Sequence, residues 1–202
     1  MQAPGLGIVP HAFVRTAKNT ITAVGTTREP QGNSIGLVRY LASGKVDIAF
    51  GSGGIVRTRI GSHASAHAAL VQPEGKIVVA GCSSSWPSGD CGSEIVLLRY
   101  LPDGSLDPEF GTGGIALKTF AGGWPEAHAL LRQPDGKIVV AGHLFENRAP
   151  RDLALLLRYH ANGTLDQNFG RAGIVEEAAM RNANEVALQP GGRIVVAGYE
   201  GV

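Results

Sequence analysis

The fold of this protein is decided by the stretch Gln72-Pro73-Glu74-Gly75-Lys76-Ile77-Val78-Val79-Ala80-Gly81. The same pattern returns at Gln133–Gly142 and Gln189–Gly198, and a degraded copy ends in Ile21-Thr22-Ala23-Val24-Gly25. Self-similarity at a fixed period is the signature of a repeat architecture and outranks local secondary-structure propensity. The chain is therefore expected to consist of copies of one structural unit.

A second motif alternates with the first and has the same period. It begins with Arg-Tyr, passes through a Gly turn and a Leu-Asp or Val-Asp pair, and ends in Phe-Gly. Its copies occupy residues 39–51, 99–111 and 158–170, with their tyrosines about 60 residues apart. One unit therefore spans about 60 residues.

Each unit contains the signals of four short strands. In the third copy we expect strand A at 128–133, strand B at 137–141, strand C at 153–159 and strand D through Leu165-Asp166 towards Phe169. Asp135-Gly136 and Asn162-Gly163 are typical of tight hairpin turns, because these residues tolerate positive φ. Strand B is apolar on both faces, as expected of a strand that is covered on both sides.

These features predict an all-β protein, a β-propeller built of four-stranded antiparallel blades. A solenoid is the competing architecture, but solenoids usually have shorter periods and fewer hairpins. The blades are expected at about 11–56, 67–118 and 128–176, with a half blade at 184–202. Three and a half blades suggest a fragment of a larger propeller, whose open edges would favour self-association.

Composition excludes several classes of partner. Eighteen basic residues balance seventeen acidic ones, so no overall field favours binding to nucleic acid. No apolar stretch approaches the roughly 20 residues that a membrane-spanning helix needs, and the N-terminus lacks the pattern of a secretory signal. Twenty-nine glycines and eleven prolines fit many short elements joined by tight turns.

Together the two motifs resemble the delta-60 repeat family of bacterial proteins. The resemblance covers about residues 11–202. It implies a propeller, often within large secreted or surface proteins, and no assigned catalytic activity. The first copy departs from the pattern, because Thr16-Ala17-Lys18-Asn19 replaces the Gln-Pro-Asp-Gly turn.

The B–C and D–A connections vary in length and lie on one face of an up-and-down blade, so that face is a candidate binding surface. Three large aromatics fall outside the expected strands there: Trp86, Trp124 and Phe145. Such side chains can anchor sugars or peptides. The alternative is that each packs onto its own blade.

Cys82 and Cys91 flank a loop where strand B ends and strand C begins, a position that suits a disulfide. A disulfide would indicate an oxidising compartment. Together with the family resemblance it favours an extracellular or cell-surface location. Two unpaired thiols remain the alternative.

No metal, cofactor or catalytic site is expected. His63 and His67 are four residues apart, a spacing that suits a metal only on a helix, and they fall in an expected loop. His11, His67 and His128 occupy equivalent places, which favours repeat packing. The recurring Asp47, Asp107 and Asp166 beside Arg39, Arg99 and Arg158 likewise predict one structural contact per blade.

The sequence thus favours a non-catalytic propeller module that binds a protein or glycan or serves as a spacer. The alternative is part of a propeller hydrolase or lyase with some of its active site in other blades. That alternative requires polar groups that differ between blades and converge at the axis.

Overall fold

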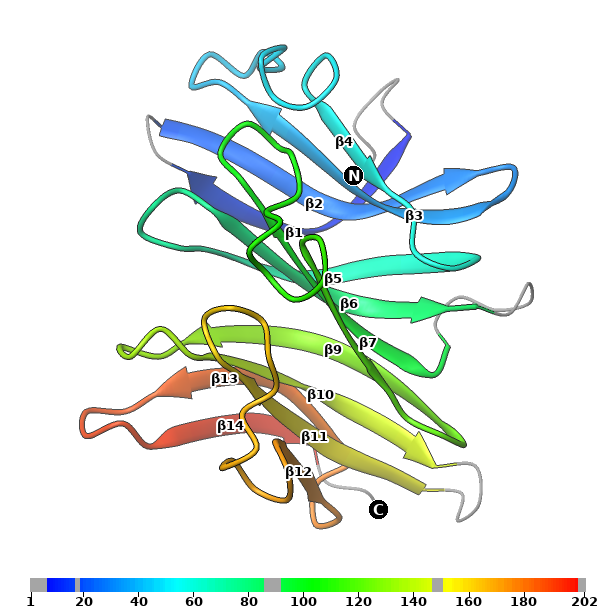
Figure 1. Ribbon diagram of the computed structural model, residues 1–202, viewed down its shortest axis with the longest axis vertical. Coiled ribbons are helices and arrows are strands. Elements are labelled where there is room, and N and C mark those ends of the chain that lie inside the picture. The colour runs from blue at the N-terminus through cyan, green and yellow to red at the C-terminus, as the bar shows by residue number, and fades with distance from the viewer. Residues whose placement is uncertain (1–6, 17–18, 86–91, 147–150, 200–202) are drawn as a thin grey trace.

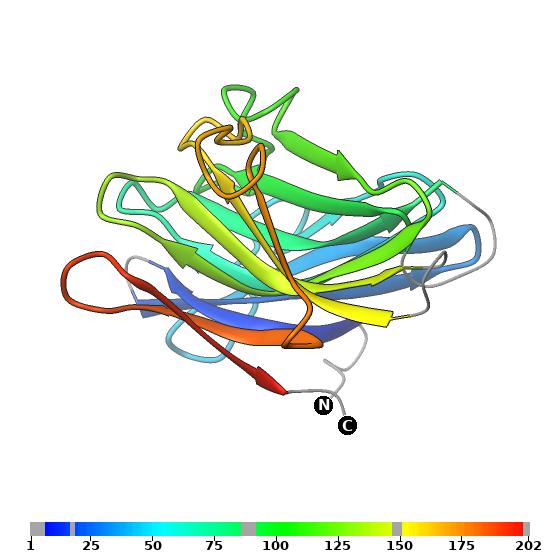
Figure 2. The ribbon, with the colours of Figure 1, turned by 90° about the horizontal axis from the view of Figure 1, so that it is seen from below.

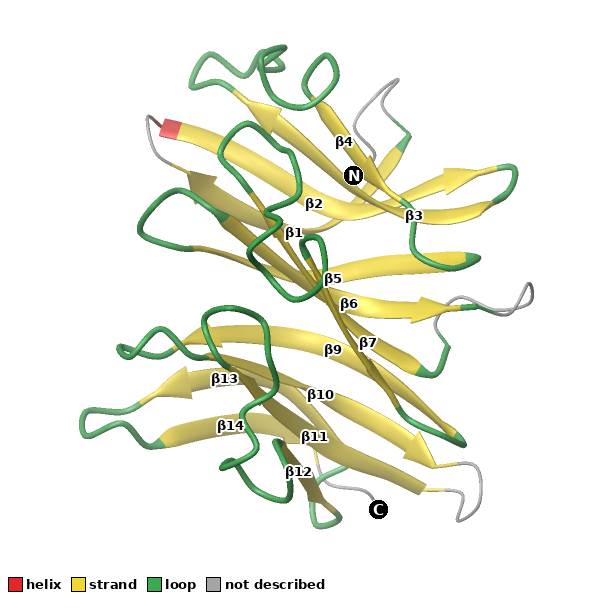
Figure 3. Ribbon diagram, viewed as in Figure 1, coloured by secondary structure: helices red, strands yellow, loops and turns green. Residues whose placement is uncertain are grey.

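The computed structural model describes residues 7–16, 19–85, 92–146 and 151–199. Within these ranges the chain forms fourteen β-strands and no α-helix (Figure 3). Consecutive strands of each sheet pair antiparallel, so every sheet is a meander. The all-β prediction is confirmed. The described part of the chain holds no helix with the length and apolarity to cross a membrane.

The strands form three four-stranded sheets and one two-stranded sheet. The first sheet consists of β1 (Ile8–Thr16), β2 (Thr20–Glu29), β3 (Gly32–Tyr40) and β4 (Ile55–Thr58). The second consists of β5 (His63–Val71), β6 (Ile77–Ser84), β7 (Glu94–Tyr100) and β8 (Ile115–Thr119). The third consists of β9 (Gly123–Arg132), β10 (Ile138–Glu146), β11 (Arg151–Tyr159) and β12 (Ile174–Glu177), and the fourth of β13 (Asn182–Leu188) and β14 (Ile194–Tyr199).

The sheets follow one another in chain order, as the blades of a propeller do. In Figure 1 the first sheet lies at the top, the second in the middle, and the third and fourth at the bottom. The first strands of successive sheets, β1, β5, β9 and β13, contact one another, and we call them the inner strands. Figure 2, turned by 90°, shows the twist of the strands across the sheets.

The second strands of the second and third blades, β6 and β10, supply core residues on both of their faces. In β6, Ile77 and Val79 pack between the first and second sheets, whereas Val78 and Ala80 pack between the second and third. Each of the isoleucine and valine side chains contributes roughly 1.5–3 kcal/mol when fully buried. The predicted two-faced burial of this strand is confirmed. The recurring Ile-Val-Val-Ala run therefore joins neighbouring blades.

Every inner strand carries a β-bulge at the same place in the repeat. The register shifts at His11, His67, His128 and Asn184, each of which is the extra residue of its strand. The bulge pushes a carbonyl against the glycine of the neighbouring strand: a Cβ on Gly142 would lie 1.8 Å from the carbonyl oxygen of Glu126. This contact explains the glycine that ends each copy of the first motif.

The expected position of the fourth strand was wrong. Leu165 makes only an isolated bridge to Tyr159, and the strand is β12, several residues later. Asp166 pairs with Arg158 and accepts the N–H of Asn168, which curls the segment into a loop. The first and second strands of the unit are longer than expected, since β9 begins at Gly123 and β10 continues to Glu146.

The repeated arginine links three structural elements. Arg99 Nε lies 2.7 Å from Asp107 Oδ2, and the guanidinium carbon lies 4.8 Å from the centre of the Phe110 ring. Its Nη1 donates to the carbonyl oxygen of Ala161 in the next blade. Equivalent pairs join Arg39 to Asp47 and Arg158 to Asp166. The predicted contact in each blade is confirmed.

Candidate functional site

An aromatic pair lies at the start of β9 and the end of β10. Trp124 is directly opposite Phe145 in the antiparallel ladder, and the rings stack with their centres 5.5 Å apart at 14°. Trp124 remains 54% exposed. Both residues belong to strands, so their expected placement in loops was wrong. Trp86, the third aromatic singled out from the sequence, lies outside the described residues.

Histidines from successive inner strands gather where those strands approach one another. His11 stacks on His67 with ring centres 5.2 Å apart, and His67 meets His128 edge-on at 6.3 Å. His11 Nδ1 donates to the carbonyl oxygen of Ala66 at 2.7 Å. Bulges re-aim side chains, and this one presents the same position of each repeat to the neighbouring blade. The expected equivalence of His11, His67 and His128 is confirmed, although His63 and His67 lie in strand β5 rather than in a loop.

Two further residues make the third blade different from the others. Glu126 lies directly opposite His143, on the face of the sheet that also carries Trp124 and Phe145. His143 Nδ1 lies 2.9 Å from His128 Nε2, and Glu126 Oε2 lies 3.9 Å and 4.0 Å from these two nitrogens. The other carboxylate oxygen, Oε1, lies 4.0 Å from Nε2 of His67 in the second blade.

The surroundings favour neutral imidazoles. Burial lowers the pKa of His67 to about 4; Glu126 opposes this shift, and the neighbouring histidines lower the pKa further. Burial also lowers the pKa of His128, with Glu126 again opposing and His143 reinforcing the shift. Near neutral pH these two rings are therefore uncharged and offer nitrogen lone pairs.

Cys82 lies beside this cluster on β6. Its sulfur is fully buried, belongs to a disulfide and contacts His67 Nε2 at 3.7 Å. Cys91, the other cysteine of the chain, lies outside the described residues. A disulfide sulfur is not a thiolate, so Cys82 in this state adds no anionic ligand to the neighbouring His67 and Glu126.

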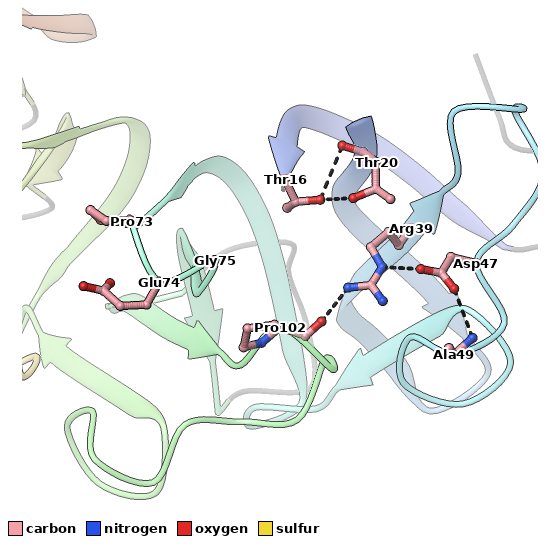
Figure 4. Close-up of a pocket in the computed structure, with 9 residues that line it drawn as sticks. All are labelled: Thr16, Thr20, Arg39, Asp47, Ala49, Pro73, Glu74, Gly75 and Pro102. Carbon is pink, nitrogen blue, oxygen red and sulfur yellow. Dashed lines mark hydrogen bonds and ion pairs between the residues drawn. The ribbon is translucent and has the colours of Figure 1, made fainter. Parts of the chain in front are cut away.

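A separate cavity of about 500 Å³ lies between the first blade and the turns of the second (Figure 4). The charged side chains on one side of the cavity are already paired, since Arg39 binds Asp47 and donates to the carbonyl oxygen of Pro102. At the opposite wall, Glu74 belongs to the turn after β5. The cavity is thus lined by the structural contacts of the repeat, and we do not assign a site to it.

Sequence reasoning missed Glu126 and His143. Comparison of the repeat copies could have found both residues. His143, for example, follows the final glycine of the first motif, where the other copies have Thr26, Cys82 and Tyr199. Strand B was expected to end at Ala141. Once β10 is known to continue past Gly142, the next side chain faces the same inter-blade space as the bulged histidine.

The comparisons with known proteins agree with this architecture. A search of the curated proteins finds no match. A family model described as "Domain of unknown function (DUF5122) beta-propeller" matches residues 72–110 and 133–169. Each matched segment runs from the turn before the second strand of a blade to the phenylalanine beneath the repeated arginine. Over these two stretches the chain is similar to a β-propeller family whose function is not defined.

Proposed function

We propose that this chain is a non-catalytic propeller module that binds a glycan or protein ligand through the face carrying Trp124 and Phe145. The observation that supports the proposal is the exposure of Trp124, which is stacked on Phe145 and held by strand pairing on both sides of β10. A rigid aromatic surface of this kind loses little conformational entropy when a ligand binds.

The chemistry beside the pair favours a glycan. An indole face packs against the C–H groups of a sugar ring, while neighbouring polar atoms can bond its hydroxyls. Glu126 and His128 lie on the same face as Trp124, and their side chains are 31% and 23% exposed. A carboxylate accepts two or more hydroxyl hydrogen bonds, which an aromatic pair alone cannot supply.

Array screening of the full chain tests this proposal. Glycan and protein arrays identify a ligand, and titration then compares Trp124→Ala with Phe13→Ala. Phe13 is the matched control, because it is a strand aromatic that is 66% exposed and lies in a different blade. We expect Trp124→Ala to weaken binding by about tenfold or more and Phe13→Ala to leave it unchanged. Equal affinities for the two variants would overturn the assignment of this face.

A second candidate function is a hydrolase or lyase. The specific observation in its favour is that Glu126 and His143 differ from their counterparts in the other blades and meet His128 and His67 between two inner strands. Turnover of a chromogenic ester, glycoside or uronide by the chain, abolished by Glu126→Gln, would establish it. Absence of turnover with all three substrate classes favours the binding module.

We further propose that the protein is secreted or displayed at the cell surface. Cys82 in a disulfide supports this location, because structural disulfides persist mainly in oxidising compartments. Thiol labelling of the denatured protein, isolated from its native host under alkylating conditions, is the test. We expect labelling only after reduction, and two free thiols in the freshly isolated protein would contradict the location.

We also propose that the chain self-associates through β14. This strand is paired only with β13 among the described residues, and it exposes Val195 and Tyr199. An unpaired strand edge with apolar side chains can pair with the same edge of a second copy. Light scattering after size-exclusion chromatography should give a dimer, and a monomer at high concentration would refute the proposal.

A further inference from the structure

Glu126, His128 and His143 form a compact group of nitrogen and oxygen ligands. The ligand atoms of the three residues all lie within 4.8 Å of one another. Imidazole nitrogen with carboxylate oxygen is the donor set that zinc and neighbouring transition metals prefer, whereas Ca²⁺ and Mg²⁺ prefer oxygen alone. We propose that these three residues bind a divalent transition-metal ion, for which Zn²⁺ is the probe.

The separations fit such an ion after small side-chain movements. Bonds of about 2.0–2.1 Å in a tetrahedral complex place ligand atoms about 3.3 Å apart. The pair His128 Nε2 and His143 Nδ1 is at 2.9 Å, and Glu126 Oε2 is at 3.9 Å and 4.0 Å from them. Each atom therefore has to move by about half an ångström, which χ rotation alone provides.

The backbone holds these ligands on adjacent strands. Glu126 and His143 are directly opposed in the ladder of β9 and β10, and His128 is the bulged residue two positions farther along. Ligands on paired strands vary less in position than ligands on loops. The bulge inserts His128 between the pairs Ala127–Gly142 and Ala129–Ala141, and from this position its ring reaches His143.

A hydrogen bond already joins the two imidazoles, and a bound ion would take the place of the proton that lies between them. In the contact between His128 Nε2 and His143 Nδ1, one nitrogen must donate and the other accept. When an ion binds, both nitrogens offer their lone pairs, and the donor ring carries its proton on its other nitrogen instead. No net proton need be released, because both rings remain neutral.

Three protein ligands leave a fourth position open. The side chains of Glu126, His128 and His143 are between 22% and 31% exposed, so water can complete the coordination. Glu126 and His143 lie on the same face of the sheet as Trp124 and Phe145. Binding of the ion requires no glycan or protein ligand.

Titration of the full chain with Zn²⁺ tests the inference. The protein is first freed of metal with a chelator, and reductant is omitted, since a reduced Cys82 would offer a thiolate near His67 and Glu126. We expect binding of one Zn²⁺ that raises the unfolding temperature and that excess Ca²⁺ does not displace. Glu126→Gln and His143→Gln should each weaken it by at least about 100-fold.

The matched control is His160→Gln, which removes an exposed histidine from the turn after β11. It should bind Zn²⁺ as the unaltered chain does. Equal affinities of the unaltered chain, Glu126→Gln and His143→Gln would overturn the inference, as would a failure of the unaltered chain to bind. Circular dichroism without metal verifies that the variants remain folded.

A measurement on the unaltered chain covers the case in which the variants do not fold. Co²⁺ in a four-coordinate site absorbs visible light far more strongly than hydrated Co²⁺, and Zn²⁺ should abolish that absorption by displacement. Ring-nitrogen NMR should then show two histidines perturbed on addition of Zn²⁺. Absorption that stays at the level of hydrated Co²⁺, or unperturbed histidine rings, would contradict the site.

Discussion

Arg99 and Asp107 form the most buried of the three repeated ion pairs, with Nε 2.7 Å from Oδ2 and only 8% and 2% of their side chains exposed. Lys76 adds a second cation at 2.8 Å from the same carboxylate oxygen. Two cations and the N–H of Glu109 therefore converge on Asp107. This carboxylate holds the second blade's long turn against its first hairpin.

Replacing Asp107 by alanine should destabilise the protein by about 3 kcal/mol, because Arg99 is then buried without its partner. Asp103→Ala is the control in the same turn. The Asp103 carboxylate is exposed and, among the described residues, bonds only Ser105, so its loss should cost less than about 1 kcal/mol. Urea denaturation of the two variants measures the difference, and equal losses would contradict a special role for Asp107.

Acid should destabilise the fold through Asp107 and Asp166. Burial alone raises the pKa of each carboxyl, but the bonds from Lys76, Glu109 N and Arg99 outweigh it at Asp107, as their counterparts do at Asp166. Both pKa values thus lie below the ordinary 3.8. The stabilisation is complete above that value and is lost as pH falls through the folded-state pKa.

Unfolding free energies measured between pH 5 and pH 2 check this dependence. The unaltered protein should lose stability continuously as pH falls below about 4, and Asp107→Asn should show a shallower slope. Parallel slopes for the two proteins would exclude Asp107 as a source of the acid sensitivity.

The two core tyrosines should respond differently to removal of the hydroxyl. Tyr100 donates to Thr58 Oγ1 at 2.7 Å, whereas the buried hydroxyl of Tyr159 has no hydrogen-bond partner among the described residues. Tyr100→Phe should therefore cost about 1 kcal/mol, and Tyr159→Phe should be neutral or stabilising. Thermal unfolding compares them, and an equal loss for both would contradict the assignment.

Alanine at Gly142 should be severely destabilising, by about 3 kcal/mol or more, because its Cβ would lie 1.8 Å from the carbonyl oxygen of Glu126. Gly113→Ala is a useful contrast, since a Cβ added at Gly113 would have nothing within 4 Å.

 At Gly113 only the backbone conformation opposes an alanine, because its φ of 60° lies in the left-handed region that L residues avoid. Strain of that kind should cost Gly113→Ala only about 1 kcal/mol. Chemical denaturation separates the two effects, and a mild loss for Gly142→Ala would show that the bulge can relax.

The sequence was sufficient to predict the repeat, the all-β architecture and the arginine contact, because these depend on local turns and on alternation that recurs in every copy. It was insufficient for the fourth strand. Leu165-Asp166 directly follows the Asn162-Gly163 turn, where a strand is expected, but Asp166 bonds both Arg158 and the N–H of Asn168, and these bonds favour a loop.

The candidate site depended on contacts between blades, which a pattern within one repeat does not contain. His128 could be identified as equivalent to His67, yet its approach to His143 depends on a bulge and on the continuation of β10 past Gly142. Trp124 was singled out for its size, whereas its stacking on Phe145 follows from strand register.

The bulge has a further consequence for how such a chain can diversify. Its geometry is set by a glycine on the adjacent strand, not by the residue that it displays, and Asn184 occupies the place of His128 without loss of the bulge. The side chain at the bulge can therefore change while the backbone conformation stays the same. A new ligand set can arise in one copy by point substitution while the remaining copies keep the scaffold intact.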